Sequence, residues 1–415
     1  MASLSSILPK GLPQALPKGL RRRGLAKVVF ACYGPLDCNS AGHIAGFAGE
    51  LAARGYAVAV AGRPPLEAAD AFGPPAFQPF ALQDLADDPA RVIGFDGALE
   101  PDRTVLVCWT PRKASRTPVM KAARRLGVPY LVHFEDNEDH LTLLRIGANE
   151  QATPEEAFAA ESRDAAERAT LMAGAIGATV IEDRLRESLP PGLPTLLLEP
   201  GVDHALFGAP LPNGRREELL RAAGVPAGAA VMVYPGNIHR ANLSEMAELY
   251  RALWLLKSRG RRLVLLKTGK DDVPVAEALG FHPADAGVHA LGMVDRPLLV
   301  ELLKCADLFV QPGAPGPFND YRLPSKLPEF MAVGRPVILP AANVGLRVRD
   351  GADALVLHGG EAAEIAEKVE AVLDDPLLAA RLSTNARSFA RRHWRWDVQG
   401  RKLADFLEHL HRARA

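Results

Sequence analysis

The chain has 415 residues, of which 48% are hydrophobic and 24% are charged, a balance typical of globular proteins. Its 49 lysines and arginines equal its 49 aspartates and glutamates, so the net charge argues against nucleic acid or another bulk polyanion as a partner. This length predicts two or three domains rather than one.

The four cysteines are scattered and lack the paired spacing of a metal site, so we expect reduced thiols and neither a bound metal nor another cofactor. No apolar run approaches the roughly 20 residues that a membrane-spanning helix needs. The N-terminus also lacks the charged-then-apolar order of a secretion signal. Together these features predict a cytoplasmic protein.

Residues 1–24 form a segment of their own. They contain Leu-Pro-Lys-Gly-Leu twice, at 8–12 and 16–20, before the run Arg21–Arg23. Proline and glycine at this density prevent a continuous helix, so we expect a flexible basic tail. An anchor for a membrane surface is the alternative that this composition leaves open.

From Lys27 onward, short apolar runs alternate with amphipathic segments. Residues 28–31 are typical of a strand, 33–42 of a glycine-containing loop, 44–54 of a helix and 58–61 of the next strand. This order predicts a βαβ unit of a doubly wound parallel sheet, with further strands at 105–108, 130–133, 180–181 and 195–198. No G-x-G-x-x-G follows the first strand, which argues against a nicotinamide dehydrogenase.

Two features of this half are candidates for function. Gly34 and Gly42 bracket the first loop, where the backbone either approaches a bound sugar or simply turns. His133 ends a predicted strand and opens an acidic run that includes Glu135 and Asp136. Ligands of open α/β sheets bind beyond such strand ends, although the acidic run is equally typical of a solvated loop.

A second series of strands begins at Ala230–Tyr234. Further strands are expected at 263–266, 288–291, 308–310, 337–339 and 355–356. Two consecutive sheets of this kind predict a bilobal protein, and a cleft between two domains is a common place for a ligand.

The most informative stretch runs from Pro317 to Pro340. A Leu-Pro pair drives the chain into extended geometry, so we expect a helix to begin after it, with Ser325 as its N-cap and Gly334 as its end. A helix that starts from a loop offers unpaired N–H groups to a phosphate. Glu329 lies one turn after Ser325, where it can accept hydrogen bonds from a ribose, with Lys326 near the phosphates. An acid favoured by the helix dipole is the alternative.

This stretch resembles the nucleotide-sugar site of GT-B glycosyltransferases, most closely the retaining family 4 group. The pattern P-x-K-L-x-E-[YF]-M-A-x-G-x-P-V stands here as PSKLPEFMAVGRPV at 324–337, and weaker similarities extend from about residue 27 to 396. The resemblance implies an α/β protein with two Rossmann-like domains, 25–205 and 206–394, that face each other across a cleft. It also implies a C-terminal helix, 395–415, that returns to the first domain.

By this resemblance, Glu329 binds the ribose of the nucleotide, and Ser325 and Lys326 lie beside the diphosphate. The family's second glutamate, in the loop that faces the donor sugar, is replaced here by Tyr321. Asp320, one place earlier, is our candidate for a substitute acid.

The loop after the first strand of the second series departs from the family pattern. The family has an arginine directly after Gly236 and a lysine five places later, whereas this chain has Asn237 and Asn242. Arg240 is the only cation of this loop, so we expect it to face the leaving diphosphate. Lys267 is a second candidate, with a surface lysine as the alternative.

Two further positions follow from the resemblance. His133 would lie near the donor and acceptor sugars, and Met293 in the loop that binds the edge of the base. The basic run Arg112–Arg125 is either a solvated helix face or a contact with the inner face of the membrane.

The resemblance therefore implies a retaining, metal-independent glycosyltransferase of polysaccharide or glycoconjugate biosynthesis. It would move a sugar from a nucleoside diphosphate sugar to a hydroxyl of a glycan, a lipid or a small molecule. Two alternatives stay open: a non-catalytic GT-B partner subunit, favoured by Asn237 and Asn242, and a nucleotide-sugar epimerase. Donor sugar, base, acceptor and oligomeric state do not follow from the sequence.

Overall fold

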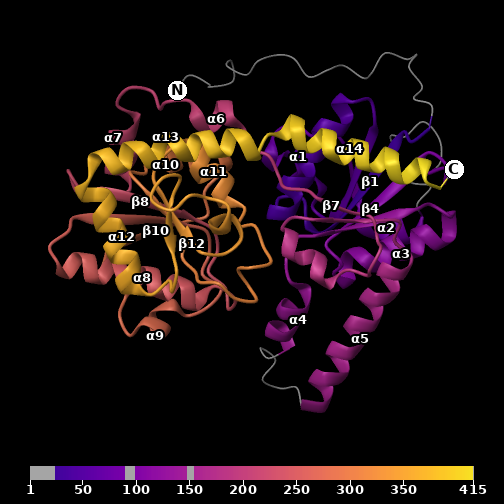
Figure 1. Cartoon of the computed structure of the whole chain (residues 1–415), viewed down its shortest axis with the longest axis horizontal. Helices are drawn as coiled ribbons and strands as arrows, with labels where there is room; N and C mark the ends of the chain where they lie inside the picture. Colours follow the sequence, from indigo (N-terminus) through magenta and orange to yellow (C-terminus); the bar gives the residue numbers. More distant parts are fainter. Residues whose placement is uncertain (1–23, 89–98, 147–153, 415) are drawn as a thin grey trace.

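The computed structural model describes residues 24–88, 99–146 and 154–414. The predicted basic tail lies outside these ranges except for Gly24. Figure 1 shows two α/β domains side by side, with the last two helices of the chain lying end to end, one over each domain. Among the described residues, none of the helices combines the length and apolar character that crossing a bilayer requires.

The N-terminal domain is built on one sheet of seven strands in the order β3-β2-β1-β4-β5-β6-β7. All neighbouring strands in it run parallel, so their carboxyl ends lie at one edge of the sheet. The strands are β1 (Lys27–Pro35), β2 (Ala57–Arg63), β3 (Gln78–Ala81), β4 (Thr104–Trp109), β5 (Tyr130–Phe134), β6 (Ala178–Val180) and β7 (Thr195–Leu197).

Strand β1 shows why helices cover both faces of this sheet. Val28 and Phe30 pack with α1 and α14, whereas Val29 and Ala31 pack with α2, α3 and α5. Successive side chains of a strand point to opposite faces, so an apolar run has to be covered on both, and the predicted doubly wound sheet is confirmed. The helices that follow the strands here are α1 (Asn39–Ala53), α2 (Leu82–Asp87), α3 (Lys113–Leu126), α4 (Glu138–Ile146) and α5 (Pro154–Ala173).

The C-terminal domain contains two parallel three-stranded sheets, β10-β9-β8 and β11-β12-β13. A parallel bridge between Met232 and Leu308 joins them, so one continuous series of strands crosses the domain. The strands are β8 (Ala230–Pro235), β9 (Leu263–Thr268), β10 (Val288–Gly292), β11 (Phe309–Val310), β12 (Val337–Pro340) and β13 (Leu355–Leu357).

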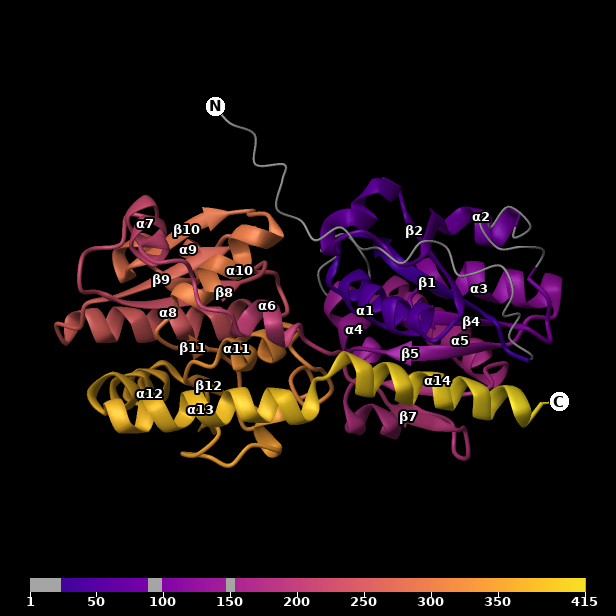
Figure 2. The same cartoon turned by 90° about the horizontal axis from the view of Figure 1, so that it is seen from above.

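Helices also cover both faces of the second series, as Figure 2 shows from above. Val231 and Val233 pack with α10, α11 and α13, while Met232 and Tyr234 pack with α8 and α12. The helices are α6 (His204–Gly208), α7 (Arg215–Ala222), α8 (Leu243–Ser258), α9 (Val275–Leu279), α10 (Arg296–Cys305), α11 (Lys326–Val333), α12 (Ala362–Asp374), α13 (Pro376–His393) and α14 (Trp396–Arg412).

Two local predictions for the N-terminal domain are wrong. Gly42 does not lie in a loop, because β1 continues to Pro35 and α1 already begins at Asn39. Strand β3 is missing from the prediction because Pro79 interrupts its short apolar pattern.

Helix α14 lies beside α1 in both views (Figures 1 and 2). Arg54 Nη2 donates to the Asp397 carbonyl oxygen at 2.8 Å, and the Trp396 ring packs edge-on against Phe47 with centroids 5.2 Å apart. A side chain at Gly46 of α1 would overlap the Trp396 ring, so this glycine permits the close approach of the two helices.

The two places where the chain crosses between the domains meet at Glu199. One carboxylate oxygen of Glu199 accepts hydrogen bonds from Trp394 Nε1 at 3.1 Å and from Arg347 Nη2 at 2.6 Å. The Trp394 carbonyl oxygen in turn accepts from the Val202 N–H at 3.0 Å. Trp394 and Trp396 therefore both serve packing between the two domains.

We expect Gly46→Ala to lower the free energy of unfolding by about 1–3 kcal/mol, because the added methyl group meets the Trp396 ring. Gly49→Ala, on the same helix with no atom near its Cβ position, should instead raise it by up to about 1 kcal/mol. Urea denaturation of the two variants measures both values. Equal values for the two would contradict the role of Gly46 in α1–α14 packing.

Candidate functional site

The stretch that carries the family pattern folds into the predicted helix and strand. Helix α11 starts at Lys326 and ends at Gly334, whose φ of +74° favours glycine. Ser325 occupies the cap position, but its hydroxyl makes no capping hydrogen bond. The predicted side-chain cap is therefore wrong, because the backbone of Ser325 already has helical angles (φ −56°, ψ −21°).

Glu329 lies in the first turn of α11, and its side chain keeps 17% of its surface exposed. It is therefore not sealed in the interior. Its Oε1 accepts a hydrogen bond from Arg296 Nη2 at 2.5 Å, and the Arg296 guanidinium lies 5.4 Å from the centroid of the Phe207 ring. Sequence reasoning missed Arg296 because it comes from another helix, 33 positions away.

Lys326 reaches from the start of α11 to the end of β8. Its Nζ lies 3.1 Å from the Tyr234 hydroxyl and 4.4 Å from the centroid of that ring. A Cβ atom at Gly236 would lie 3.7 Å from Nζ, and the φ of +129° at Gly236 favours glycine. The glycine loop after β8 and the cation of α11 thus lie side by side.

The two asparagines that replace the family's cations hold the shape of this loop. Asn237 Oδ1 accepts from the Lys270 N–H at 2.9 Å. Asn242 Oδ1 accepts from the His239 N–H at 2.8 Å, and its Nδ2 donates to the Asn237 carbonyl oxygen at 3.1 Å. Arg240 is exposed in the same loop and has no hydrogen bond or ion pair within the described part of the chain.

Lys267 is buried, with 1% of its surface exposed, so the alternative of a surface lysine is wrong. Its Nζ donates to the Gly269 carbonyl oxygen at 3.1 Å and pairs with Asp271. A side chain at Gly269 would collide with the backbone of Gly236, so the loops after β8 and β9 pack closely. Lys267 therefore stabilises the loop after β9 from its buried side.

Asp320 and Tyr321 lie at the contact between the domains. Asp320 pairs with Arg184 at 2.6 Å, and the Tyr321 hydroxyl donates to Glu187 Oε2 at 2.8 Å. Both partners belong to a short 3-10 helix of the N-terminal domain (Asp183–Ser188). The loop predicted to face the donor sugar therefore also holds the two domains together.

Arg322, which sequence reasoning did not single out, lies at the centre of this loop. Its Nη2 donates to Asn319 Oδ1 at 2.8 Å and pairs with Glu245 Oε2 at 3.4 Å. Desolvation raises the pKa of Asp136 in the N-terminal domain, while the charges of Arg112 and Arg322 oppose this shift. Arg322 is therefore close enough to act on acids of both domains.

His133, which we expect near the donor and acceptor sugars, has a buried side chain. It is 1% exposed, its Nδ1 lies 2.8 Å from the Thr179 hydroxyl, and its ring lies 3.8 Å from that of Trp109 between centroids. Its Nε2 is buried without a hydrogen-bond partner in the described structure. Burial lowers the pKa of His133 to about 3, so the ring is neutral.

Glu135 is the centre of a polar cluster rather than part of a solvated loop. It is buried, its Oε1 lies 2.7 Å from His43 Nδ1, and its other oxygen accepts from the Ser40 hydroxyl. Burial alone would raise the pKa of Glu135, but the hydrogen bond and charge of His43 lower it to about 2. Ser40 and His43 come from the first turns of α1, which sequence reasoning had read partly as loop.

The remaining predicted positions lie at strand ends. Gly34 is buried near the end of β1, where an added Cβ would meet the Cys38 sulfur at 3.1 Å. The sulfurs of Cys32 and Cys38 lie 3.8 Å apart, and all four cysteines are free thiols, as expected. Met293 follows β10 and is 66% exposed.

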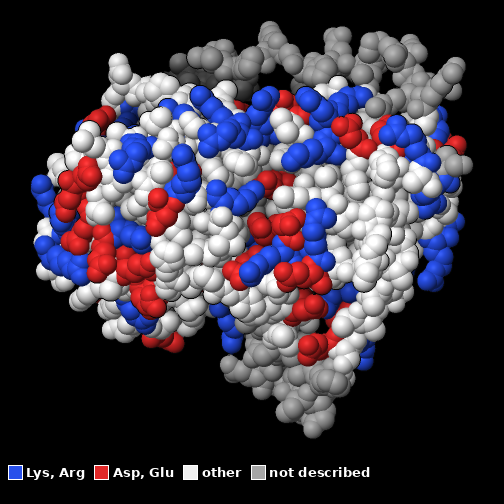
Figure 3. All heavy atoms as spheres, viewed as in Figure 1, with Lys and Arg blue, Asp and Glu red and all other residues white. Residues whose placement is uncertain are grey.

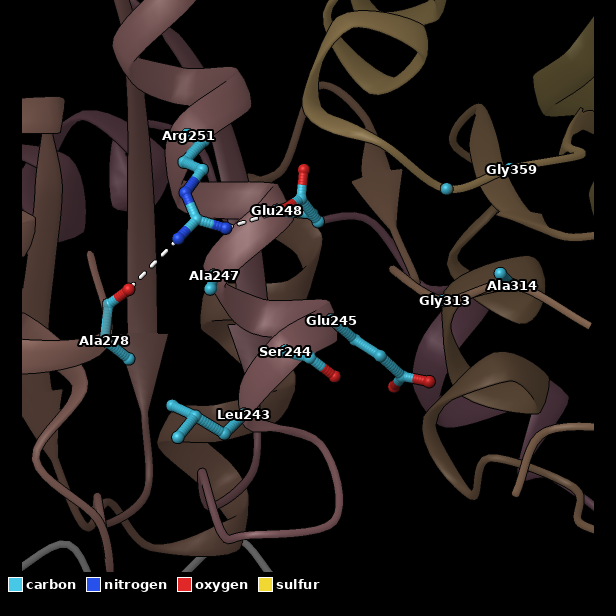
Figure 4. Close-up of a pocket in the computed structure, with 11 residues that line it drawn as sticks. Leu243, Ser244, Glu245, Ala247, Glu248, Arg251, Ala278, Gly313, Ala314 and Gly359 are labelled. Atoms are coloured by element: carbon cyan, nitrogen blue, oxygen red, sulfur yellow. Dashed lines mark hydrogen bonds and ion pairs between the residues drawn. The ribbon is translucent and has the colours of Figure 1, made fainter. Parts of the chain in front are cut away.

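Two pockets border the loop that contains Arg322, each lined by one domain. The first, of about 450 Å³, lies between the start of α8 and the residue pairs Gly313–Ala314 and Gly359–Gly360 (Figure 4). Glu245 lines it and also pairs with Arg322. The second, of about 560 Å³, lies beyond β5 and includes Asp136 and Glu187 among its lining residues. The second pocket therefore adjoins the domain contact made by Tyr321.

Charges of both signs occur over the face seen in Figure 3, with basic side chains gathered above α13 and α14. The predicted basic run of α3 is divided: Arg116 is buried and pairs with Asp164 at 2.7 Å, and Arg112 pairs with Glu138 at 3.0 Å. Four others, Lys113, Lys121, Arg124 and Arg125, are exposed.

Within the described residues, no group of three or more histidines, cysteines or acids could hold a metal ion.

Comparisons with known proteins agree with this architecture. Residues 229–375 match the model of the family described as glycosyl transferases group 1. The crystal structure of Anabaena HepE in complex with UDP-glucose superposes with a TM-score of 0.67, at 14% identity, over 92% of this chain and 99% of that chain.

Two curated relatives are described as D-inositol 3-phosphate glycosyltransferases. The protein from Thermobispora bispora is 28% identical over 312 residues, 70% of this chain and 68% of its own. The protein from Arthrobacter sp. is 31% identical over 186 residues, 43% of this chain and 41% of its own, so the chain spans less than half of that relative. The fold and these matches confirm the resemblance to GT-B glycosyltransferases, and residues 229–375 carry the group 1 pattern.

The buried His133 makes stability depend on pH. In the folded protein its pKa is about 3, whereas the unfolded chain takes up a proton near 6.5, so the unfolded state binds more protons between these values. This contribution is present above pH 6.5 and is lost as the pH falls toward 3, by roughly a few kcal/mol in total.

We therefore expect the free energy of unfolding of His133→Asn to fall less steeply than that of the wild type between pH 6.5 and 4.5. Glu135, with an ordinary pKa of 4.5, contributes to the slope only at the acidic end of this range, and it is present in both proteins. Urea denaturation at several pH values measures the difference. Identical slopes would show that His133 is not held neutral by burial.

Proposed function

We propose that this protein is a retaining, family 4-like glycosyltransferase that takes a sugar from a nucleoside diphosphate sugar without a metal ion. The observation that carries the proposal is the start of α11, where Lys326 and Glu329 lie one turn apart beside the Gly236 loop. Its cation suits a diphosphate, and its carboxylate suits the hydroxyls of a ribose. Solved structures of this fold that contain UDP-glucose or UDP support a nucleotide-sugar donor.

The leaving diphosphate gains negative charge in the transition state, so fixed donors near it lower the barrier. Lys326, the first N–H groups of α11 and the exposed Arg240 of the neighbouring loop would supply this stabilisation. Ser325, whose hydroxyl does not cap the helix, would donate to the same phosphates. Met293 and its loop would lie at the base.

The sugar and acceptor side would be built from both domains. Asp320 and Tyr321 bring the loop after β11 to the N-terminal domain. Gly34 and the pair of His43 and Glu135 lie at the strand ends on the opposite side. The pocket beyond β5 would hold part of a hydroxyl-bearing acceptor. The buried His133 would pack behind the residues that line this pocket and support them. A contact of the exposed cations of α3 with an anionic membrane, if the acceptor is a lipid, belongs to the same proposal.

A non-catalytic partner subunit is the second candidate. It is favoured by Asn237 and Asn242, which use their side chains to shape the loop where the family has cations. A screen of nucleotide sugars that scores both nucleotide release and glycosylated product separates the candidates. Nucleotide binding without turnover of any donor would support the partner subunit, and a changed sugar without acceptor would support an epimerase.

We expect Lys326→Met to lower the rate of transfer by about 100-fold, since it removes a fixed cation from the leaving group. Lys121→Met, an exposed lysine of α3, is the control and should transfer a sugar to a soluble acceptor at the wild-type rate. Steady-state kinetics with the donor found in the screen measures both. A normal rate for Lys326→Met would exclude this lysine from the diphosphate site.

A further inference from the structure

We propose that Arg296 is the positioning residue for Glu329, and that it sets the preference of the site for a nucleotide with ribose hydroxyls. The inference rests on the proposed function, because it concerns the nucleotide side of the same site. It adds a residue from α10, outside the stretch with the family pattern.

The two carboxylate oxygens of Glu329 differ in their hydrogen bonding. Arg296 Nη2 donates to Oε1 at 2.5 Å, while Oε2 has no hydrogen-bond partner among the described residues. A carboxylate held in this way keeps one oxygen fixed and presents the other as an acceptor. A hydroxyl group is the donor that suits an isolated carboxylate oxygen, since it gains a charge-assisted hydrogen bond.

The position of Arg296 is itself well defined. It is the first residue of α10, directly after Asp295, whose side chain caps the helix by accepting from the Leu298 N–H at 2.9 Å. Pro297 follows and fixes the backbone in the first turn. The guanidinium lies over the Phe207 ring at 5.4 Å from its centroid, a third restraint on its place.

Without Arg296, the carboxylate would have another cation within reach. Lys326 and Glu329 are three positions apart on α11, a spacing at which side chains of a helix meet. The bond to Arg296 holds Glu329 away from Lys326, so the acid serves the ribose and the lysine the diphosphate. An ordinary surface ion pair would have no such effect on ligand choice and would contribute little to stability.

The test compares UDP and GDP with their 2′,3′-dideoxy analogues by isothermal titration calorimetry. For the nucleotide that binds, the wild type should prefer the ribose form by more than about tenfold, because two hydroxyls bond to a charged group. Arg296→Met should reduce this preference to less than about threefold, as should Glu329→Gln, while Arg296→Lys should keep part of it. Arg215→Met is the matched control, since Arg215 pairs with Glu301 at 2.7 Å at a similar exposure.

Two results would overturn the inference while leaving the proposed function intact. In the first, Arg296→Met weakens both forms of the nucleotide by the same factor and keeps the preference. In the second, the Arg296→Met variant binds the ribose form more tightly than the wild type does, which would mean that Arg296 occupies the place of the ribose. If the wild type binds no nucleoside diphosphate, the proposed function fails and the inference fails with it. Unchanged melting temperatures confirm that the variants are folded.

Discussion

Parallel pairing of the strands is the constraint on which the rest of this structure depends. Because all strands of a sheet run in one direction, the loops that follow them collect at a single edge. The glycine loops after β8 and β9 therefore meet, and the loop after β11 reaches the N-terminal domain. Residues that are distant in the chain, such as Asp136 and Arg322, come together at the facing edges of two sheets.

Burial then divides the polar residues at these edges into two groups. Lys267 and His133 are buried and hydrogen-bond to other residues of the protein, so they stabilise the structure around the site. Lys326, Arg240 and one oxygen of Glu329 are left toward solvent on the C-terminal side. A ligand with several phosphates and hydroxyls matches this second group, because each of its charges finds a partner of opposite sign.

The sequence was sufficient for the fold class and for α11, since the pattern from Pro324 to Val337 combines a breaker, a helix and an apolar strand. The sequence was insufficient for predicting which side chains bond to one another in the fold. Arg296 with Glu329 and His43 with Glu135 join elements that lie far apart in the chain, 33 and 92 positions respectively. It also did not reveal that Lys267 and His133 are buried, because a polar residue at a strand end is buried or exposed depending on neighbours that periodicity does not show.

This arrangement explains how asparagines fit where the resembling family has an arginine and a lysine. Asn237 and Asn242 place their side chains inside the loop after β8, where longer charged side chains would have to point outward. In the proposed site, positive charge would come from Lys326 and from Arg240 of the same loop, and Arg322 adds a cation in the loop that reaches the N-terminal domain. Because Arg322 also acts on Asp136 across the domain contact, any shift of the domains changes the field at the same place. The charge that Arg322 adds to the proposed site therefore depends on the distance between the domains, whereas the charge of Arg240 on the β8 loop does not.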